Sequence, residues 1–328
     1  MNIKKPIINI IWNKRNVTKI LNEYILSLTY TDYLKGQSDE LTLKLINPEN
    51  LFNNDWYPQK GDKIQAQIGY SGQKMLNCGT FSIDEPEFEF LREGDFVTIK
   101  SLGASINEKV REVNSRPFDN KTLVQIAREI GKKHGFEVRG TQGHYKIARV
   151  SQYRESDLAF LARISSQYGY IFKLTDNILT FTRVADIEQA EPLSFITRKN
   201  IKSLRLRDSS TKTYNACSVK YQNPKTGKLV SYTAKTETTG TKRETLKLNE
   251  TCATKQEAVS RANAGLKNGQ ITVSGSIELM EGNPYFMAGS MHTLSGFGKL
   301  DGRYKVNQTS HEVTKDDWSI SGEIEKNG

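Results

Sequence analysis

The stretch YRESDLAFLARISSQYGYIFKLTDNILTFTRV, residues 153–184, decides how the middle of this chain folds. In its first half, apolar side chains recur at helical spacing (Leu158, Leu161, Ile164 and Tyr168), and Gly169 follows where a left-handed cap belongs. In its second half, YIFKL and ILTFTRV alternate apolar and polar residues around the turn TDN. The stretch therefore predicts a helix near 157–168 followed by a β-hairpin.

Two acids and a serine stand together at the start of this helix. Ser156 can accept a hydrogen bond from a free N–H of the first turn, which is worth about 1 kcal/mol. Asp157 then lies at the positive end of the helix dipole. We interpret Glu155, Ser156 and Asp157 as a helix start. The alternative is that Glu155 and Asp157 are the acids of a cell-wall hydrolase, which would need both acids in a cleft.

A second helix is predicted just upstream. FDNKTLVQIAREIGKKHGFEV, residues 118–138, places apolar residues at helical spacing, ahead of a cationic end and Gly135. With the first helix and the hairpin, this pattern predicts a small α/β module over 111–192, with helices near 120–134 and 157–168.

The regions on either side of the module have β patterns. ELTLKLIN (40–47) and DKIQAQIGY (62–70) alternate apolar and polar residues between turn signals. After residue 193 the alternation resumes, interrupted by a helix near 255–268 that begins with the capping-box residues Thr254 and Glu257. We predict a mainly β fold with an α+β insertion: a first antiparallel β-barrel over 1–110, the module over 111–192, and a second β-barrel over 193–328.

The two β regions resemble each other in sequence. GTFSIDEPEFEFLREGDFVTI begins at Gly79, and GRYKVNQTSHEVTKDDWSIS begins at Gly302. The matched pairs are Gly79/Gly302, Phe81/Tyr304, Ile83/Val306, Phe90/Val313 and, after a one-residue gap, Phe96/Trp318. This similarity predicts that both β regions are copies of one fold.

The composition narrows the classes of function. No GxGxxG, GxxxxGK[ST], HExxH or GxSxG motif occurs, and Cys78, Cys217 and Cys252 are too far apart for a CxxC site. The four histidines are not at metal-ligand spacing. We therefore predict no catalytic residue, no cofactor, no metal site and no disulfide.

Charge leaves one further alternative open. The chain has 47 Lys and Arg against 37 Asp and Glu, and the densest basic region is RKNIKSLRLRDSSTKTYNACSVKY, residues 198–221. It alternates like a strand with its charges on one solvated face, although a basic nucleic-acid-binding β-barrel would also show a positive excess. No run reaches the ~18 apolar residues of a membrane span. The N-terminus is typical of a strand, not a signal peptide, so we expect folding in the bacterial cytoplasm.

Two separated segments resemble one known family. YRESDLAFLARISSQYGYIF (153–172) is similar to the E-S-D-x-x-F-L-x-R-x-x-x-x-G-Y signature of contractile-tail hub proteins. These are the phage late control gene D family, the N-terminal part of VgrG, and the hubs of tailocins. EAVSRANAGLKNG (257–269) and GNPYFMAGSMHTLSGFGKLDGRYKVNQTSHEV (282–313) resemble the same family's A-x-A helix, G-x-P-x-x-x-A-G turn and G-x-Y-x-V-x-x-x-x-H strand.

The resemblance implies a structural role without catalysis. It implies two tube-protein-like barrels joined by a helical module, in a homotrimer that adapts the sixfold tail tube to the threefold central spike. The implied partners are the tail tube protein, the central spike protein, the baseplate wedge proteins and the tape measure protein. After assembly the chain would be part of a phage tail or a tailocin particle. The resemblance leaves open whether that particle is a phage, a bacteriocin or a secretion device.

Overall fold

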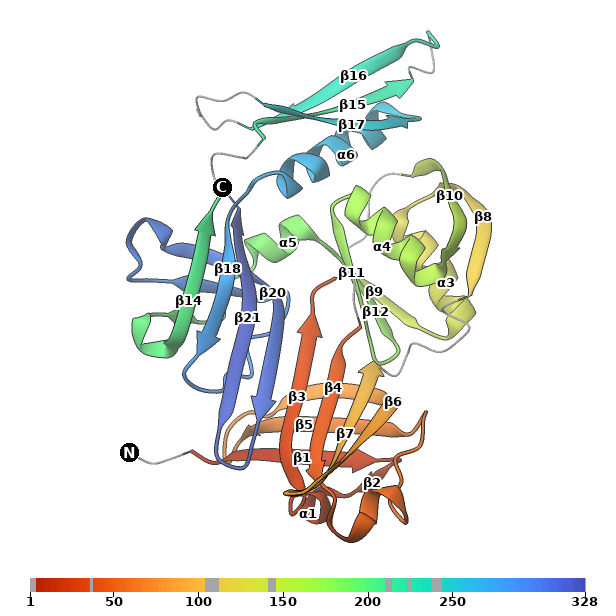
Figure 1. Cartoon of the computed structure of the whole chain (residues 1–328). Coiled ribbons are helices and arrows are strands. Elements are labelled where there is room, and N and C mark those ends of the chain that lie inside the picture. The colour runs from red at the N-terminus through yellow and green to blue at the C-terminus, as the bar shows by residue number, and fades with distance from the viewer. Residues whose placement is uncertain are drawn as a thin grey trace.

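The computed structural model describes residues 4–35, 38–103, 112–140, 146–209, 214–222, 226–236 and 244–327. These residues form one long, twisted sheet, an α/β module beside its middle, and a small sheet with a helix at one end (Figure 1). The mainly β class with an α+β insertion is confirmed. The division of the chain at 110 and 192 remains a prediction.

The first β region contributes β1 (Pro6–Trp12), β2 (Arg15–Asn16), α1 (Thr18–Leu21), β3 (Ile25–Tyr33), β4 (Glu40–Ile46), η1 (Pro48–Asn53), β5 (Lys63–Tyr70), β6 (Leu76–Leu91) and β7 (Gly94–Gly103). The second contributes β13 (Phe195–Ile196), η2 (Arg198–Asn200), β14 (Ile201–Asp208), β18 (Ile271–Leu279), β19 (Met291–Leu294), η4 (Gly298–Leu300), β20 (Gly302–Val313) and β21 (Trp318–Asn327). Both regions alternate buried and exposed residues, as half-buried strands do.

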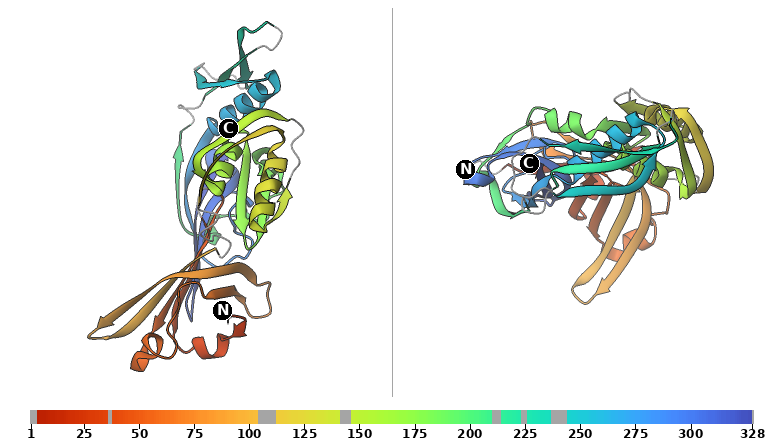
Figure 2. Two further views of the ribbon diagram at one scale, coloured as in Figure 1. Left: turned by 90° about the vertical axis from the view of Figure 1, so that its right-hand side faces the viewer. Right: turned by 90° about the horizontal axis from the view of Figure 1, so that it is seen from above.

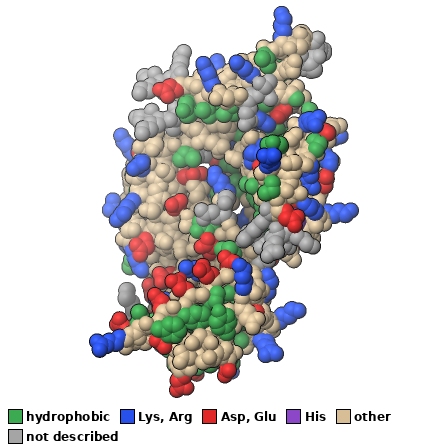
Figure 3. All heavy atoms as spheres, turned by 45° about the vertical axis from the view of Figure 1, so that its right-hand side comes forward, with side chains coloured by type: hydrophobic (Ala, Val, Ile, Leu, Met, Phe, Trp, Pro, Cys, Tyr) green, Lys and Arg blue, Asp and Glu red, His purple; other side chains and the backbone are tan. Residues whose placement is uncertain are grey.

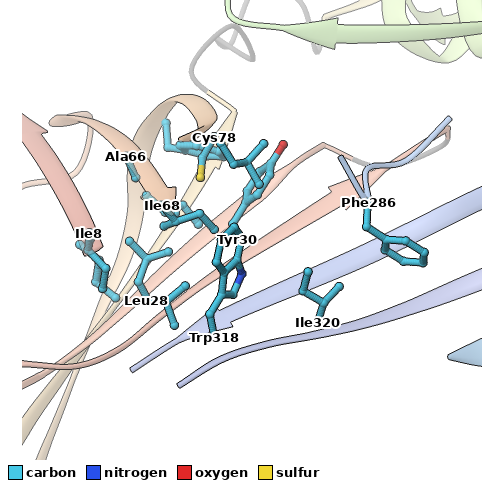
Figure 4. Packing of buried hydrophobic residues seen from close by; sticks show 14 of the residues in the cluster. Ile8, Leu28, Tyr30, Ala66, Ile68, Cys78, Phe286, Trp318 and Ile320 are labelled. Atoms are coloured by element: carbon cyan, nitrogen blue, oxygen red, sulfur yellow. The ribbon is translucent and has the colours of Figure 1, made fainter. Parts of the chain in front are cut away.

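The two β regions join edge to edge. The sheet order is β14-β18-β21-β20-β3-β4-β7-β6-β5-β1-β2, with β19 also paired to β20 and β13 paired to β19. The junction is the antiparallel pairing of β20 with β3, from Gln308 opposite Tyr33 to Val313 opposite Leu28, which we call the seam. Side chains of both regions, among them Tyr30 and Trp318, share one buried cluster (Figure 4). The sheet is therefore continuous across both β regions.

Strand pairing shows that the second β region repeats the first. The β6–β7 hairpin shifts register between Ile83 and Glu85, and the β20–β21 hairpin shifts at the equivalent place, between Val306 and Gln308. A constant offset of 223 residues, as from Ile83 to Val306, maps every printed β6–β7 pair from Ile83 to Phe90 onto a β20–β21 pair. Gly79 and Gly302 both have positive φ, of 99° and 139°. The glycines that head the two similar segments therefore have similar backbone roles.

The neighbouring strands repeat in the same way. The β3–β4 pair shifts register between Ile25 and Ser27, and the β14–β18 pair shifts between Ile201 and Ser203. An offset of 176 residues, as from Ile25 to Ile201, therefore maps β3 onto β14. The four-strand unit β3-β4-β7-β6 corresponds to β14-β18-β21-β20 in order and in register.

One residue match from the sequence is wrong. The common register places Trp318 at the position of Asp95, so the gap that matched it to Phe96 does not exist. Trp318 is fully buried, whereas the tip of the β6–β7 hairpin extends away from the core as an arm (Figure 2). Because the tip of the arm has left the core, Asp95 stands where β21 has the buried Trp318, whereas Val97 and Ile320 are both buried at the next equivalent position.

The α/β module contains β8 (Val113–Lys121), α3 (Leu123–His134), β9 (Glu137–Gly140), β10 (Ile147–Ser156), α4 (Asp157–Gln167), β11 (Tyr170–Thr175), β12 (Ile178–Arg183) and α5 (Val184–Gln189). Its core includes Phe118, Ile126, Phe160 and Leu161. Ser156 caps α4 by accepting a hydrogen bond from the Ala159 N–H at 3.2 Å, and Gly135 ends α3 in the left-handed conformation. The β11–β12 hairpin lies where the alternation placed it.

The insertion into the second β region is larger than the single helix expected. It comprises β15 (Ala216–Gln222), β16 (Leu229–Lys235), β17 (Thr245–Cys252) and α6 (Lys255–Asn268), with the helix packed on a sheet of its own. Ala258 and Ala262 share a small core with Cys217, and a Cβ at Gly265 would lie 2.8 Å from the Cys217 sulfur. Small residues therefore let α6 approach its sheet closely.

Candidate functional site

Asp157, the first residue of α4, lies at the centre of a buried ionic cluster. Its side chain is fully buried and accepts four hydrogen bonds. The donors are Arg116 Nη2 (2.8 Å) and Gln152 Nε2 (2.9 Å) to Oδ1, and Lys133 Nζ (3.0 Å) and His134 Nε2 (2.7 Å) to Oδ2. The carboxylate therefore ties β8, α3 and β10 to the start of α4.

The partners of Asp157 control its protonation. Burial alone would raise the pKa of this carboxyl, but hydrogen bonds from His134, Gln152 and Lys133, with the charge of Arg116, lower the pKa to about 2. Asp157 is thus a structural group that is ionised at neutral pH. The sequence alone indicates only that Asp157 has a favourable position at the helix dipole. Its hydrogen-bond donors could not be recognised, because they lie between five and 41 residues away on other elements.

Glu155 is held in a separate contact. Arg163, two turns along α4, donates from Nη2 to Glu155 Oε1 at 2.6 Å and from Nε to both carboxylate oxygens at 3.2 Å. The same guanidinium donates to the Ser151 carbonyl at 2.9 Å. The two acids thus have different partners, and the pKa of Asp157 is lowered, the opposite of what a general acid near neutral pH needs.

Two hollows lie along α4 and β11. One, of about 260 Å³, is lined by Leu158, Ala159, Phe172 and Lys173, among others, and the other, of about 360 Å³, by Ala162, Ser166 and Gly169, among others. Neither Glu155 nor Asp157 lines them. The hydrolase alternative needs both acids in one cleft, and these hollows do not provide it.

Replacing Asp157 by asparagine is expected to remove a pH-dependent part of the stability. The pKa of Asp157 is lower in the folded chain than the ~3.9 of an unfolded one, so its contribution is complete above about pH 4 and is lost as the pH falls towards 2. We expect a loss of at most about 2 kcal/mol at pH 7 that shrinks by pH 3, measured by urea unfolding. Glu155→Gln, in the neighbouring ion pair, is the matched control, with an effect below about 1 kcal/mol. A loss that is the same at both pH values would contradict this assignment.

A second ionic group joins the module to the sheet; we call Lys173, Asp32 and Asp39 the ionic junction. Lys173 Nζ, on β11, pairs with Asp32 of β3 and lies 3.2 Å from Asp39 Oδ2. Asp32 Oδ2 accepts a hydrogen bond from the Ala288 N–H at 2.9 Å, and Asp39 Oδ1 accepts one from the Tyr33 N–H at 3.1 Å. The junction therefore connects the module with both β regions where the seam begins.

Both acids of the ionic junction are almost completely buried, with Asp32 1% and Asp39 5% exposed. Burial raises the pKa of Asp39 to about 6, the charge of Lys173 acts against this rise, and the nearby Asp32 adds to it. One lysine is thus the shared ion-pair partner of two buried carboxyl groups, so its loss leaves both without a paired cation.

The module also contacts the α6 insertion through a buried polar group. Tyr168, at the end of α4, donates its hydroxyl to Glu257 Oε1 at 2.7 Å, and Arg261 Nη2 lies 3.2 Å from that oxygen. Glu257 Oε2 accepts the Ala253 N–H at 3.1 Å, while Thr254 caps the helix through the Glu257 N–H. Glu257, which the sequence predicts as part of the capping box, thus also links α6 to Tyr168 at the end of α4, 89 residues earlier.

The remaining sequence candidates lie in the core. The three cysteines are buried free thiols, and burial raises the pKa of the Cys78 thiol. His311 Nε2 donates to the Phe286 carbonyl at 3.0 Å, and Trp318 Nε1 donates to His311 Nδ1 at 3.3 Å. Burial lowers the pKa of His311 to about 4. Among the described residues, no group of three or more His, Cys, Asp or Glu side chains is placed to hold a metal, and no helix is long and apolar enough to cross a bilayer.

Solved structures with a similar fold include tail proteins. The fold matches the tail protein from Neisseria meningitidis MC58 at a TM-score of 0.72 and 10% identity, over 98% of this chain and 97% of that one. It matches the 43 kDa tail protein of prophage MuSo2 from Shewanella oneidensis at 0.71 and 15% identity, over 97% and 98%. The E. coli c3393 protein, a component of the type VI secretion system, matches at 0.57 and 12% identity, over 92% and 73%.

Sequence similarity then defines the family. The phage tail baseplate hub (GPD) family model matches residues 109–317, more than half of the 328 residues, and the chain belongs to this family. The probable baseplate hub protein of Escherichia phage 186 is 23% identical over 173 residues, and that of phage P2 is 25% identical over 159 residues. These matches span 52% and 48% of this chain but only 43% and 40% of the relatives. The resemblance found in the sequence motifs is confirmed.

Proposed function

We propose that three copies of this chain form the hub of a contractile-tail baseplate and adapt a sixfold tail tube to a threefold central spike. The observation that carries the proposal is the repeat of one four-strand unit, β3-β4-β7-β6, as β14-β18-β21-β20 in a single sheet. Three chains would present six such units, so a threefold object would offer a nearly sixfold face. A sixfold tail tube can dock evenly only on a face whose contact units also repeat six times around the axis.

The proposed role is mechanical. Under this proposal the hub contacts the tail tube protein on its nearly sixfold face and the central spike protein on its threefold face, with baseplate wedge proteins and the tape measure protein as further partners. The continuous sheet and the two buried ionic groups would carry the load between these faces. We propose that the chain has no catalytic activity and that it folds in the bacterial cytoplasm before it enters the tail.

The mass of the purified chain in solution tests this proposal. Light scattering is expected to give three times the monomer mass of 37.2 kDa, alone or together with the spike protein of the same particle. A chain that stays monomeric in the presence of both the tube and the spike proteins would contradict the proposal.

A further inference from the structure

Two strand edges, one in each β region, have no partner strand among the described residues. The first edge is the outer half of β6, from Glu85 to Phe90, which lies beyond the end of β5 and pairs only with β7. The second is β14, which pairs on one side with β18 and ends the sheet. They lie apart in the molecule: β14 borders the second β region, and β6 runs in the arm that projects from the first (Figures 1 and 2). Unpaired edges of this kind are templates for pairing with another chain.

The seam shows how these two edges can pair. Within the chain, β20 pairs antiparallel with β3, and the repeat makes β6 the equivalent of β20 and β14 the equivalent of β3. Subtracting 223 from the β20 residues of the seam, and adding 176 to its β3 residues, gives a definite register between β6 and β14. In this register the opposed pairs are Glu85/Ser209, Pro86/Asp208, Glu87/Arg207, Phe88/Leu206, Glu89/Arg205 and Phe90/Leu204.

The register matches charge with opposite charge. Glu87 would lie opposite Arg207, and Glu89 opposite Arg205, on the same face of the joined sheet. In the single chain Glu87 pairs with Lys100 at 3.3 Å and Glu89 with Lys44 at 3.8 Å, but these are exposed ion pairs that hold the carboxylates weakly. The register comes from backbone pairing alone, so the match of charges supports it independently.

The other face of the same register matches apolar with apolar. Phe88 would lie opposite Leu206, and Phe90 opposite Leu204. Phe90 is 60% exposed in the single chain, although it occupies the position of the buried Val313 in the seam. Hydrophobic and acidic side chains lie close together on the lower part of the surface, which the first β region forms (Figure 3). A second chain would cover Phe90 as β3 covers Val313.

Pro86 makes the edge selective. Proline has no N–H to donate and is tolerated on edge strands, where it hinders indiscriminate strand addition. Together with three glutamates, it disfavours pairing with acidic or neutral strands but leaves the basic β14 a suitable partner.

We propose that β6 of one chain pairs antiparallel with β14 of the next, as a copy of the seam between chains. Because the two edges differ, each contact is heterologous and can close a ring. The inference rests on the trimeric hub proposed above and names the surfaces that form it. In the closed ring, each four-strand unit would pair with one neighbour through the seam within its own chain and with the other neighbour through the β6–β14 contact between chains.

Paired cysteines test the register. Opposed residues of an antiparallel pair have Cα atoms about 4.5–5.5 Å apart, within the range of a disulfide. In a Glu87→Cys and Arg207→Cys double variant, mild oxidation is expected to link most of the protein into covalent trimers on a non-reducing gel. Both positions are exposed and the native cysteines are buried, so the fold and the background should be unaffected.

The matched control moves one cysteine along the same strand. Glu87→Cys with Ser203→Cys places the thiols four residues, or about 13 Å, out of register, and we expect little cross-linking. If the wild-type chain is a trimer but the Glu87/Arg207 pair does not cross-link, or the control cross-links equally well, the contact is wrong and the trimeric hub stands. If the wild-type chain is a monomer with both partners present, the hub proposal fails and this inference with it.

Charge reversal gives a second test that requires no disulfide. Glu87→Arg with Glu89→Arg is expected to weaken trimer formation by about tenfold or more, because four cations would then meet at the edge. Adding Arg205→Glu and Arg207→Glu should restore the trimer. If the variant with all four substitutions has the melting temperature of wild type but does not form the trimer, the register is wrong.

Discussion

Replacing Lys173 by methionine is expected to destabilise the fold by about 3–5 kcal/mol at pH 7. The substitution keeps the length of the side chain but leaves Asp32 and Asp39 buried without a cation, and an uncompensated buried charge typically costs this much. Urea unfolding of the variant and of wild type measures the loss.

The pH dependence of this variant identifies the cause. Without Lys173, the pKa of Asp39, which is already raised to about 6 by burial, should rise further above the ~3.9 of an unfolded chain, so folding takes up protons. The variant should therefore regain stability relative to wild type as the pH falls from 7 to 5. Lys100→Met, which removes only the exposed ion pair with Glu87, is the control and should cost less than about 1 kcal/mol. Equal losses in both variants, or a loss that does not shrink on acidification, would contradict the role of the ionic junction.

Replacing Leu161 by aspartate is expected to cost at least about 4 kcal/mol. Leu161 is 0% exposed in the core of the α/β module, so the change removes its apolar contacts and buries a polar or charged group without a partner. A large fall in the urea midpoint, or insoluble protein, is the expected result.

Ala159→Asp is the matched control for Leu161→Asp. It places the same side chain on the exposed face of the same helix, within the first turn, where a negative charge is favourable. It should change the stability by less than about 1 kcal/mol. If the two variants unfold at the same urea concentration, the assignment of the buried face of α4 is wrong.

Local patterns in the sequence predict the local elements well. Helical spacing predicts α3 and α4, alternation around a turn predicts the β11–β12 hairpin, and Ser156 caps its helix as expected. The glycine and aromatic matches from Gly79 and Gly302 also predict the repeat. These features depend on residues a few positions apart, so one sequence is enough to find them.

Contacts between distant residues could not be predicted in this way. Lys173 and Asp32 are 141 residues apart, and neither stands in a pattern that indicates burial or a partner. Asp157 looks like an ordinary helix start until the fold brings Arg116 and Lys133 to it. The seam between β20 and β3 could be predicted only if all the other strand pairs were already known, because those pairs determine which strand edges remain free. The strands beside α6 were expected in the second barrel, but they form a sheet of their own, because alternation within a strand does not say which strands it pairs with.

Single-particle electron cryomicroscopy of the purified chain, viewed down its symmetry axis, tests whether three chains form the proposed hub. We expect a closed threefold ring in which six similar four-strand units follow one another at about 60° intervals. A ring with another number of chains, or a threefold ring in which the two units of each chain do not occupy equivalent places, would contradict it.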